Sequence, residues 1–409
     1  MKNLIVKAFY VVVFLTIFLL CSCGNKDKNK KVSVINDIIK LDGKDEYTQD
    51  FAVYQMNNGH QNITYYYDAK QKLEVPLCNK PDCTHTNEKD CLAREDMQMP
   101  LIIDKRLYFY GKSTDKEKVM GTSLFCCKTD GSDRKEIAVF EDTEEILAGY
   151  YEDGKYYSYY RKSYEIVEKK DPKGNTYKTI SEEQNNPYDT GLYCTDIASG
   201  KTKKVYSKND EYYVELQSFK VWKNSLYFLL SYYDIDVFNE LQVEDWAARV
   251  EHSELKLIKV DLDSLEETVV KDLKGKTDTH IYGDALYYSN RTDDYMPASE
   301  VYCFNLETGE EKMLFAEKYK VFDECNGKIL ISSSDGEIGL YNRENDNIEK
   351  TVKLENGTFI SAYFEDTVFL TGFLEDENGN QDYYSYSVSN EDFWTGKSSL
   401  EKRFKVVDQ

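Results

Sequence analysis

The sequence predicts an all-β protein, a seven-bladed β-propeller of four-stranded antiparallel blades. A unit of Tyr-rich strands, separated by short polar turns, recurs along most of the 409 residues. The chain contains 35 Tyr residues, and Tyr favours the half-buried surface of a pleated sheet. The shortest repeat, from Asn305 to Asn342, has nearly the length of a propeller blade of about 40 residues. A propeller leaves only short, protected sheet edges, which suits a chain of many short strands.

Two turns mark the repeated units, one after the third strand and one before the second. The turns after the third strand lie at Asp68, Lys128, Asp196, Asp261, Asn305, Asn342 and Ser389. The turns before the second strand lie at residues 104–105, 153–154, 223–224, 283–284, 326–327 and 365–366. Turn residues at fixed offsets between β-rich runs are what β-hairpins require. If the turn at Asp68 or Ser389 is wrongly assigned, the ring has six or eight blades.

Closing the ring requires one blade that combines strands from both ends of the chain. The segment Lys31 to Lys40 contains five Val and Ile residues, so it is our candidate for the strand that completes the last blade. We expect helix only in the N-terminal segment and in the long loop Ser231 to Glu254.

The first 22 residues indicate a lipoprotein signal peptide. Positive charge precedes the apolar run Ala8 to Leu20, which is too short to span a bilayer comfortably as a helix. The run ends in Leu-Cys-Ser-Cys, residues 20–23, which resembles the lipobox of bacterial lipoproteins. The resemblance implies cleavage before Cys23 and palmitoylation of that residue. An uncleaved anchor or an ordinary secretory signal is the alternative.

This assignment divides the chain into three parts. Residues 1–22 form the signal peptide, residues 23–40 the lipidated Cys and a tether with the candidate closing strand, and residues 41–409 the β-propeller. We therefore expect a monomer, held by its N-terminal lipid on the extracytoplasmic face of the bacterial cell membrane. The formal net charge of -22 excludes nucleic acid and anionic lipid headgroups as main partners.

Three Cys residues occupy equivalent positions in the repeat. Cys126, Cys194 and Cys303 each lie two residues before the turn that follows the third strand. Equivalent residues of radiating blades lie too far apart to pair with one another. We expect these three to be small buried hydrophobic side chains.

The densest group of potential metal ligands comprises Cys78, Cys83, His85 and Cys91, in the connection between the first and second units. Three Cys and one His form one of the tetrahedral ligand sets of structural zinc. The spacing Cys-x4-Cys-x-His-x5-Cys matches no zinc-finger spacing that we can name. A disulfide, for example between Cys83 and Cys91, competes with zinc outside the cytoplasm, and a loop of reduced thiols is the third interpretation. Structural zinc is the only cofactor that the sequence suggests.

The stretch Leu-Cys-Asn-Lys-Pro-Asp-Cys-Thr-His, residues 77–85, is distinctive. With the lipobox and the Tyr-rich repeats, it resembles a group of surface lipoproteins of low-GC bacteria that have TolB-like or related β-propeller domains. The resemblance extends over nearly the whole mature chain. It implies the propeller fold and no particular activity.

Insertions between the second and third strands of the units predict a binding face. They occur at residues 161–190, 231–254, 290–299 and 374–381, and in a four-stranded meander such loops all emerge on one face. The insertions carry aromatic residues that could stack on a sugar or a peptide, namely Tyr232, Tyr233, Trp246 and Tyr295. The alternative is that the loop 231–254 packs on itself as a cover of its blade.

No catalytic residue can be assigned from the sequence. It lacks a Gly-x-Ser-x-Gly nucleophile elbow and contains only four His. With 74 Asp and Glu residues, pairs of carboxylates occur by chance and are no evidence of catalysis. We therefore predict not an enzyme but a scaffold that binds a neutral glycan, a peptide or a protein partner through its loop-rich face. The alternative is a hydrolase or lyase that acts on a cell-surface or extracellular polymer.

Overall fold

The structure, a computed structural model, divides the chain into two units, residues 1–34 and 35–409, and every described residue belongs to the second. The described residues are 46–47, 51–57, 62–68, 73–78, 83, 91, 93, 97–103, 106–114, 121–128, 130–141, 144–162, 166–170, 172–174, 176–180, 189–209, 213–233, 253–290, 300–316, 319–325, 328–333, 335–354, 358–364, 366–375, 381–396 and 404–406. The predicted signal peptide, the lipidated Cys23 and the segment Lys31 to Lys40 lie outside them. In the part of the chain that the structure describes, no helix has the length and apolar character needed to cross a membrane.

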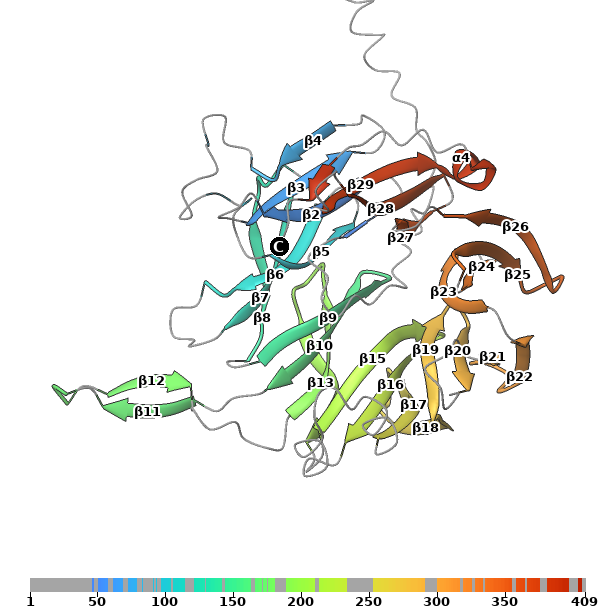
Figure 1. Ribbon diagram of the computed structural model, residues 1–409. Coiled ribbons are helices and arrows are strands. Elements are labelled where there is room, and N and C mark those ends of the chain that lie inside the picture. Colours follow the sequence, from blue (N-terminus) through green and yellow to red (C-terminus); the bar gives the residue numbers. More distant parts are fainter. Residues whose placement is uncertain are drawn as a thin grey trace, which may run out of the picture. The chain divides into compact units, whose positions relative to one another are not determined.

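The described strands form seven four-stranded antiparallel sheets and one two-stranded hairpin (Figure 1). The first three sheets are β1 (Glu46–Tyr47), β2 (Phe51–Asn57), β3 (Asn62–Asp68) and β4 (Leu73–Pro76); β5 (Gln98–Ile103), β6 (Arg106–Lys112), β7 (Thr122–Lys128) and β8 (Lys135–Val139); and β9 (Glu144–Glu152), β10 (Lys155–Lys162), β13 (Asp189–Asp196) and β14 (Thr202–Asn209). The hairpin, β11 (Ile166–Lys170) and β12 (Thr176–Ile180), lies in the chain between β10 and β13 of the third sheet and forms a separate two-stranded sheet.

The remaining sheets follow in chain order. They are β15 (Tyr213–Trp222), β16 (Ser225–Tyr233), β17 (Ser253–Asp261) and β18 (Glu267–Asp272); β19 (Lys276–Tyr282), β20 (Ala285–Asn290), β21 (Glu300–Asn305) and β22 (Glu311–Ala316); β23 (Tyr319–Cys325), β24 (Lys328–Ser333), β25 (Glu337–Asn342) and β26 (Asn347–Lys353); and β27 (Thr358–Tyr363), β28 (Thr367–Glu375), β29 (Gln381–Ser389) and β30 (Phe404–Val406). Each sheet is thus built from one continuous stretch of chain, as propeller blades are.

The predicted ends of the third strands are confirmed. Each predicted residue ends the third strand of a sheet: β3 at Asp68, β7 at Lys128, β13 at Asp196, β17 at Asp261, β21 at Asn305, β25 at Asn342 and β29 at Ser389. At Asn305, the side-chain Oδ1 accepts hydrogen bonds from the backbone N–H groups of Glu307 (2.9 Å) and Thr308 (2.8 Å). A side chain that satisfies nearby backbone groups favours a tight turn over a continued strand.

Two-residue turns join the first and second strands where the sequence predicted them. Asp153 and Gly154, between β9 and β10, have φ values of 45° and 78°. Lys223 and Asn224, between β15 and β16, have φ values of 47° and 60°. Two successive positive φ values define the hairpin turn whose twist matches that of the strands it joins. These turns therefore fix the pairing register from the hairpin end.

The last sheet differs from the prediction in two respects. Its fourth strand is β30, which pairs with β29 and comes from the C-terminal end of the chain. A short helix, α4 (Asn390–Thr395), lies between these strands. Outside the N-terminal segment, we had expected helix only at 231–254. Among the described residues, β30 takes the place of the strand that we sought in Lys31 to Lys40, and the role of that segment, which lies outside them, stays a prediction.

Local capping explains why a helix replaces the turn predicted at Ser389. The Ser389 Oγ accepts a hydrogen bond from the N–H of Asp392 (3.1 Å), and Gly396 ends the helix with a φ of 65°. Ser is a preferred N-cap, because its hydroxyl satisfies a backbone N–H of the first turn. The Trp394 Nε1–H donates to the Tyr363 hydroxyl (2.9 Å), which holds α4 on its own sheet.

Much of the Tyr excess is used for packing between consecutive sheets. The rings of Tyr110 in β6 and Tyr156 in β10 meet edge to face, with centroids 5.5 Å apart and planes at 81°. The Tyr110 hydroxyl also hydrogen-bonds the Ser158 hydroxyl. Farther along, Tyr206 of β14 packs on Phe228 of β16 at 4.7 Å. Such aromatic pairs stabilise a fold by about 0.5–1.5 kcal/mol beyond their burial.

The Cys residues at equivalent positions lie opposite a Tyr in the neighbouring strand. The pairs in register are Tyr108 with Cys126, Tyr157 with Cys194 and Tyr287 with Cys303. Cys126 and Cys194 are buried, as predicted, whereas Cys303 is half-buried. The repeat therefore places a small side chain where a Tyr ring needs room.

Candidate functional site

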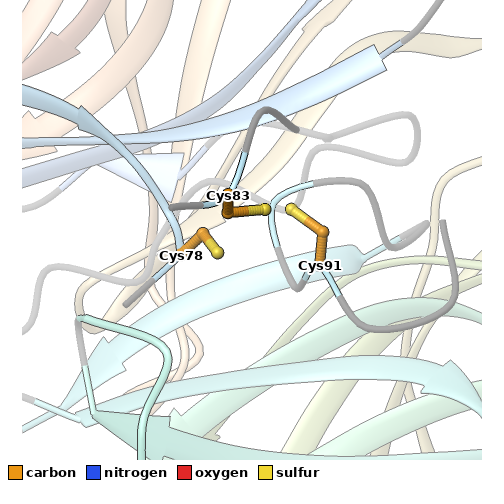
Figure 2. A group of neighbouring side chains, drawn as sticks. All are labelled: Cys78, Cys83 and Cys91. Atoms are coloured by element: carbon orange, nitrogen blue, oxygen red, sulfur yellow. The ribbon is translucent and has the colours of Figure 1, made fainter. Parts of the chain in front are cut away.

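A cysteine cluster, formed by Cys78, Cys83 and Cys91, lies in the connection from β4 to β5. The three Sγ atoms all lie within 4.8 Å of one another. Figure 2 shows that the three side chains are directed toward one another. Cys91 is buried, and Cys78 and Cys83 are half-buried.

The surroundings of the cysteine cluster are apolar. Leu77, Ala93 and Met97, which come from the same connection, are each 0% exposed. They belong to one hydrophobic core with Leu107 and Phe109 of β6, and Cys78 and Cys83 pack against this core. The cluster therefore lies at the packing between the first and second sheets.

Burial controls the protonation of Cys91 in the cysteine cluster. It raises the pKa of the Cys91 thiol to about 12, and hydrogen bonds with Cys83 and Cys78 act in the same direction, against one from the Ala93 N–H. The thiol therefore keeps its proton at neutral pH unless a cation replaces that proton. Of the four predicted ligands, His85 lies outside the described residues. Zinc, or a disulfide, at this position stays a prediction.

The predicted ligand-binding face is described only in part. Tyr232 lies in β16, which extends three residues, 231–233, into the segment that we predicted as a loop. The Nζ atoms of Lys208 and Lys256 lie 5.2 Å and 5.3 Å from the centroid of its ring. The side chain of Tyr233 and the residues Trp246 and Tyr295 lie outside the described part of the chain. Ligand binding by these residues stays a prediction.

A polar cluster that the sequence analysis missed lies along the sheet β19–β22 and includes Lys271 of the preceding β18. This tyrosine–carboxylate cluster comprises Lys271, Lys276, Tyr288, Asn290, Glu300, Tyr302 and Glu311. The rings of Tyr288 and Tyr302 stack with centroids 5.5 Å apart and planes at 12°. Because β20 ends at Asn290 and β21 begins at Glu300, the predicted insertion leaves the sheet beside these two residues, whereas Glu311 begins β22 opposite Phe304, toward the other end of β21.

Glu311 is the first of two carboxylates in the tyrosine–carboxylate cluster. It accepts hydrogen bonds from the Lys271 Nζ (2.5 Å) and from the Tyr288 hydroxyl. These two donors, Lys271 first, lower the pKa of Glu311, and burial opposes them. Burial, followed by the hydrogen bond to Glu311, raises the pKa of Tyr288. At neutral pH, Glu311 therefore carries a negative charge and Tyr288 keeps its proton.

Glu300 is the second carboxylate of this cluster. Its Oε2 accepts hydrogen bonds from the Tyr302 hydroxyl (2.8 Å) and the Asn290 Nδ2 (2.7 Å). The Lys276 Nζ donates to the Oδ1 of Asn290 (2.5 Å), which orients the amide toward Glu300. Glu300 and Tyr302 are half-buried and the Glu311 side chain is 38% exposed, so a ligand can reach the cluster from solvent.

A second polar group that the sequence analysis missed surrounds Glu144, the first residue of β9. The Glu144 side chain is 0% exposed, and its Oε1 lies 3.0 Å from the Lys204 Nζ of β14. Its Oε2 accepts hydrogen bonds from the Tyr193 hydroxyl (2.7 Å) and the Glu141 N–H (3.1 Å). Protein donors thus hold both oxygens of this buried carboxylate, which indicates a structural role.

The chain matches no known protein family, and no curated protein matches it in sequence. Solved structures are similar to it in fold. A puromycin-hydrolyzing peptidase of Mycobacterium tuberculosis shares 9% identity and a TM-score of 0.54, over 92% of this chain and 55% of the peptidase. This chain therefore spans about half the length of that enzyme.

Two other solved structures are also similar to the chain. The β-propeller domain of the trilobed protease of Pyrococcus furiosus shares 10% identity and a TM-score of 0.49, over 90% of this chain and 98% of that domain. TolB of Acinetobacter baumannii shares 13% identity and a TM-score of 0.35, over 84% of this chain and 75% of TolB. With its repeated sheets and its likeness to the peptidase, the chain has an all-β propeller fold of four-stranded antiparallel blades.

The prediction that the protein is not an enzyme is contradicted by these comparisons. The puromycin-hydrolyzing peptidase is an enzyme, so a fold similar to this one occurs in a catalytic protein. Identities of 9% and 10% show the fold alone and assign no activity to this chain. The prediction failed because it treated the absence of known catalytic motifs as evidence against catalysis.

Proposed function

We propose that the protein is a hydrolase or lyase that acts on a polymer outside the cytoplasm, and that the polymer binds at the tyrosine–carboxylate cluster. One observation carries this proposal. Two carboxylates, Glu300 and Glu311, each accept a hydrogen bond from one ring of a stacked Tyr pair, and an inserted loop joins the sheet at Glu300. The likeness to the puromycin-hydrolyzing peptidase supports the proposal in one respect, because it shows that a similar fold occurs in an enzyme.

The chemistry of the cluster favours a neutral polysaccharide as the substrate. Glycoside hydrolysis uses two carboxyl groups, of which one protonates the leaving group and the other acts as base or nucleophile. The ionised Glu311 suits the role of base or nucleophile, and Glu300 is the candidate for protonating the leaving group. An aromatic ring such as that of Tyr302 offers an apolar face on which a sugar ring packs. The net charge of -22 disfavours a polyanionic substrate.

The proposed site would work at the cell surface. In this proposal, residues 41–409 form one ring, each four-stranded sheet is one of its seven blades, and a lipid on Cys23 holds the monomer on the extracytoplasmic face of the bacterial membrane. The support is the number of described four-stranded sheets and the resemblance of residues 20–23 to a lipobox. A component of the cell surface, or an extracellular polymer, is then within reach of the enzyme.

A substrate panel with matched variants tests the proposal. The purified mature chain is incubated with neutral polysaccharides, polyuronates and peptides, and new reducing ends, new C=C double bonds and new amino groups are measured. We expect new reducing ends from a neutral polysaccharide, and a loss of at least about 100-fold in rate for Glu311→Gln and for Glu300→Gln. The control is Glu267→Gln, an exposed carboxylate of β18 outside the cluster, which should act like the wild type.

Two results would overturn the proposal. One is that no polymer of the panel is cleaved by protein whose folding is confirmed by circular dichroism. The other is cleavage that persists unchanged in both Gln variants, since the cluster would then not be the site. Cleavage of peptides alone would reject a polysaccharide substrate.

A further inference from the structure

We propose that Cys78, Cys83 and Cys91 bind one zinc ion as thiolates, and that this ion fastens the first sheet of the propeller to the second. This inference is independent of the proposed activity. It concerns the connection from β4 to β5, whereas the tyrosine–carboxylate cluster lies on β18 to β22.

The distances between the sulfurs suit a shared metal. Their mutual separations of at most 4.8 Å leave a point that lies within about 2.8 Å of all three. Tetrahedral zinc has Zn–S bonds of about 2.3 Å, which places its sulfurs about 3.8 Å apart. Closing each separation by at most about 1 Å through side-chain rotation would therefore give the geometry of a zinc–trithiolate site.

The convergence of three sulfurs separates zinc from the competing disulfide. A disulfide bonds two sulfurs at about 2.05 Å and gives the third no reason to lie beside them. Here Cys78, Cys83 and Cys91 each lie within 4.8 Å of both others, although four and seven residues separate them along the chain. A single ion with thiolate ligands accounts for all three positions, and three protons leave the thiols as it binds.

The surroundings also resemble those of structural thiolate sites. The Ala93 N–H donates a hydrogen bond to the Cys91 sulfur. Such donors orient metal-bound ligands and are part of most metal sites. The buried side chains of Leu77, Ala93 and Met97 line the same connection and limit the access of water. Thiolate ligands in apolar surroundings select soft or borderline metals such as zinc over magnesium and calcium.

The position of the cluster gives the ion a structural role. Cys78 follows β4 of the first sheet, where the Leu77 N–H is bonded to the Thr64 carbonyl of β3 (2.9 Å). Cys91 precedes β5 of the second sheet and belongs to the core that includes Leu107. An ion bound to both residues therefore cross-links the first sheet to the second.

Metal analysis of the full mature chain, purified without a metal-affinity tag, tests this inference. We expect one zinc per chain by native mass spectrometry and elemental analysis. Replacement by Co²⁺ should produce the thiolate charge-transfer and visible bands of a tetrahedral site. Cys91→Ser and Cys83→Ser should each weaken metal binding at least 100-fold. Cys127→Ala is the matched control, because Cys127 is buried in the same core and lies outside the cluster, so it should keep full stoichiometry.

Three results would reject the zinc site. The first is a native mass that lacks two hydrogens, with a disulfide mapped between two of the three Cys residues. The second is folded wild-type protein that takes up neither Zn²⁺ nor Co²⁺ after treatment with a reductant. The third is Co²⁺ bands of unchanged intensity in Cys83→Ser. The Co²⁺ spectrum is measured on wild-type protein, so it remains decisive if Cys91→Ser fails to fold.

Discussion

Replacing Glu144 with Gln tests whether the buried polar group between β9 and β14 stabilises the propeller. The substitution keeps the shape of the side chain but removes the charge that faces the Lys204 Nζ at 3.0 Å. Breaking a buried ion pair by removing one partner costs about 3–5 kcal/mol. Lys204 is 29% exposed and keeps the Glu141 carboxylate at 3.5 Å. We therefore expect the low end of that range, about 3 kcal/mol lost from the free energy of unfolding.

Calorimetry and urea unfolding measure this loss. An unfolding entropy of about 2.1 cal/mol/K per residue gives about 0.8 kcal/mol/K for a domain of roughly 360 residues, so 3 kcal/mol corresponds to a fall of about 4 °C in Tm. Glu141→Gln is the control, because the Glu141 side chain is 62% exposed. Exposed ion pairs contribute little, and we expect a change below about 1 kcal/mol for this variant.

A double-mutant cycle isolates the interaction between Glu144 and Lys204. Lys204→Met removes the charge and keeps most of the side-chain volume. If the two groups interact directly, the double variant should lose about 1–2 kcal/mol less stability than the two single variants together. Strict additivity, or a loss below about 1 kcal/mol for Glu144→Gln alone, would refute the assignment of a buried ion pair.

Three further predictions concern the anchor, a buried His and a turn. Cys23→Ala should release the chain from membranes and leave its circular dichroism unchanged, because the lipid is the expected anchor; a variant that stays in the membrane fraction after signal cleavage would contradict this. Burial lowers the pKa of His280, against the opposing effect of Asp278, so the folded state favours the neutral ring. Below the ordinary His pKa of 6.5, His280 binds a proton in the unfolded chain but not in the folded chain. The free energy of unfolding should therefore decrease as the pH decreases. Urea unfolding from pH 7.5 to 5 should therefore show a shallower fall for His280→Gln, and equal slopes would reject this. Asn305→Ala should lower the free energy of unfolding by about 1 kcal/mol, because two backbone N–H groups lose their acceptor. Asn347→Ala, at an exposed position of β26, should change it by less than about 0.5 kcal/mol, and equal effects would show that the turn needs no side-chain acceptor.

The strand order of this protein could be derived from the sequence because its turns are set by short-range hydrogen bonds. The Asp196 carboxylate accepts from the Ser199 N–H (2.8 Å), as the Asn305 amide does from Thr308, three residues on. Such contacts form whatever the rest of the chain does. Their positions in the sequence therefore located the end of each third strand.

The cysteine cluster was predicted in part from the sequence and decided in part by the folded chain. Three Cys residues within one short connection indicated that their side chains can meet, and the tetrahedral zinc set was predicted on that basis. The folded connection decided that the three sulfurs converge within 4.8 Å beside the core of the first two sheets. Spacing alone left zinc and a disulfide equally open.

Only the tertiary structure decided which charged groups meet. Glu144 and Lys204 are 60 residues apart, and Lys271 and Glu311 are 40 apart on different sheets. Among 74 Asp and Glu residues, no local pattern distinguishes these partners. The same holds for β30, a strand of three residues that is identified by its pairing with β29. The physical reason is range: turn chemistry acts within three or four residues, whereas the pairing of distant charges and strands depends on a register that exists only once the sheets have formed and packed.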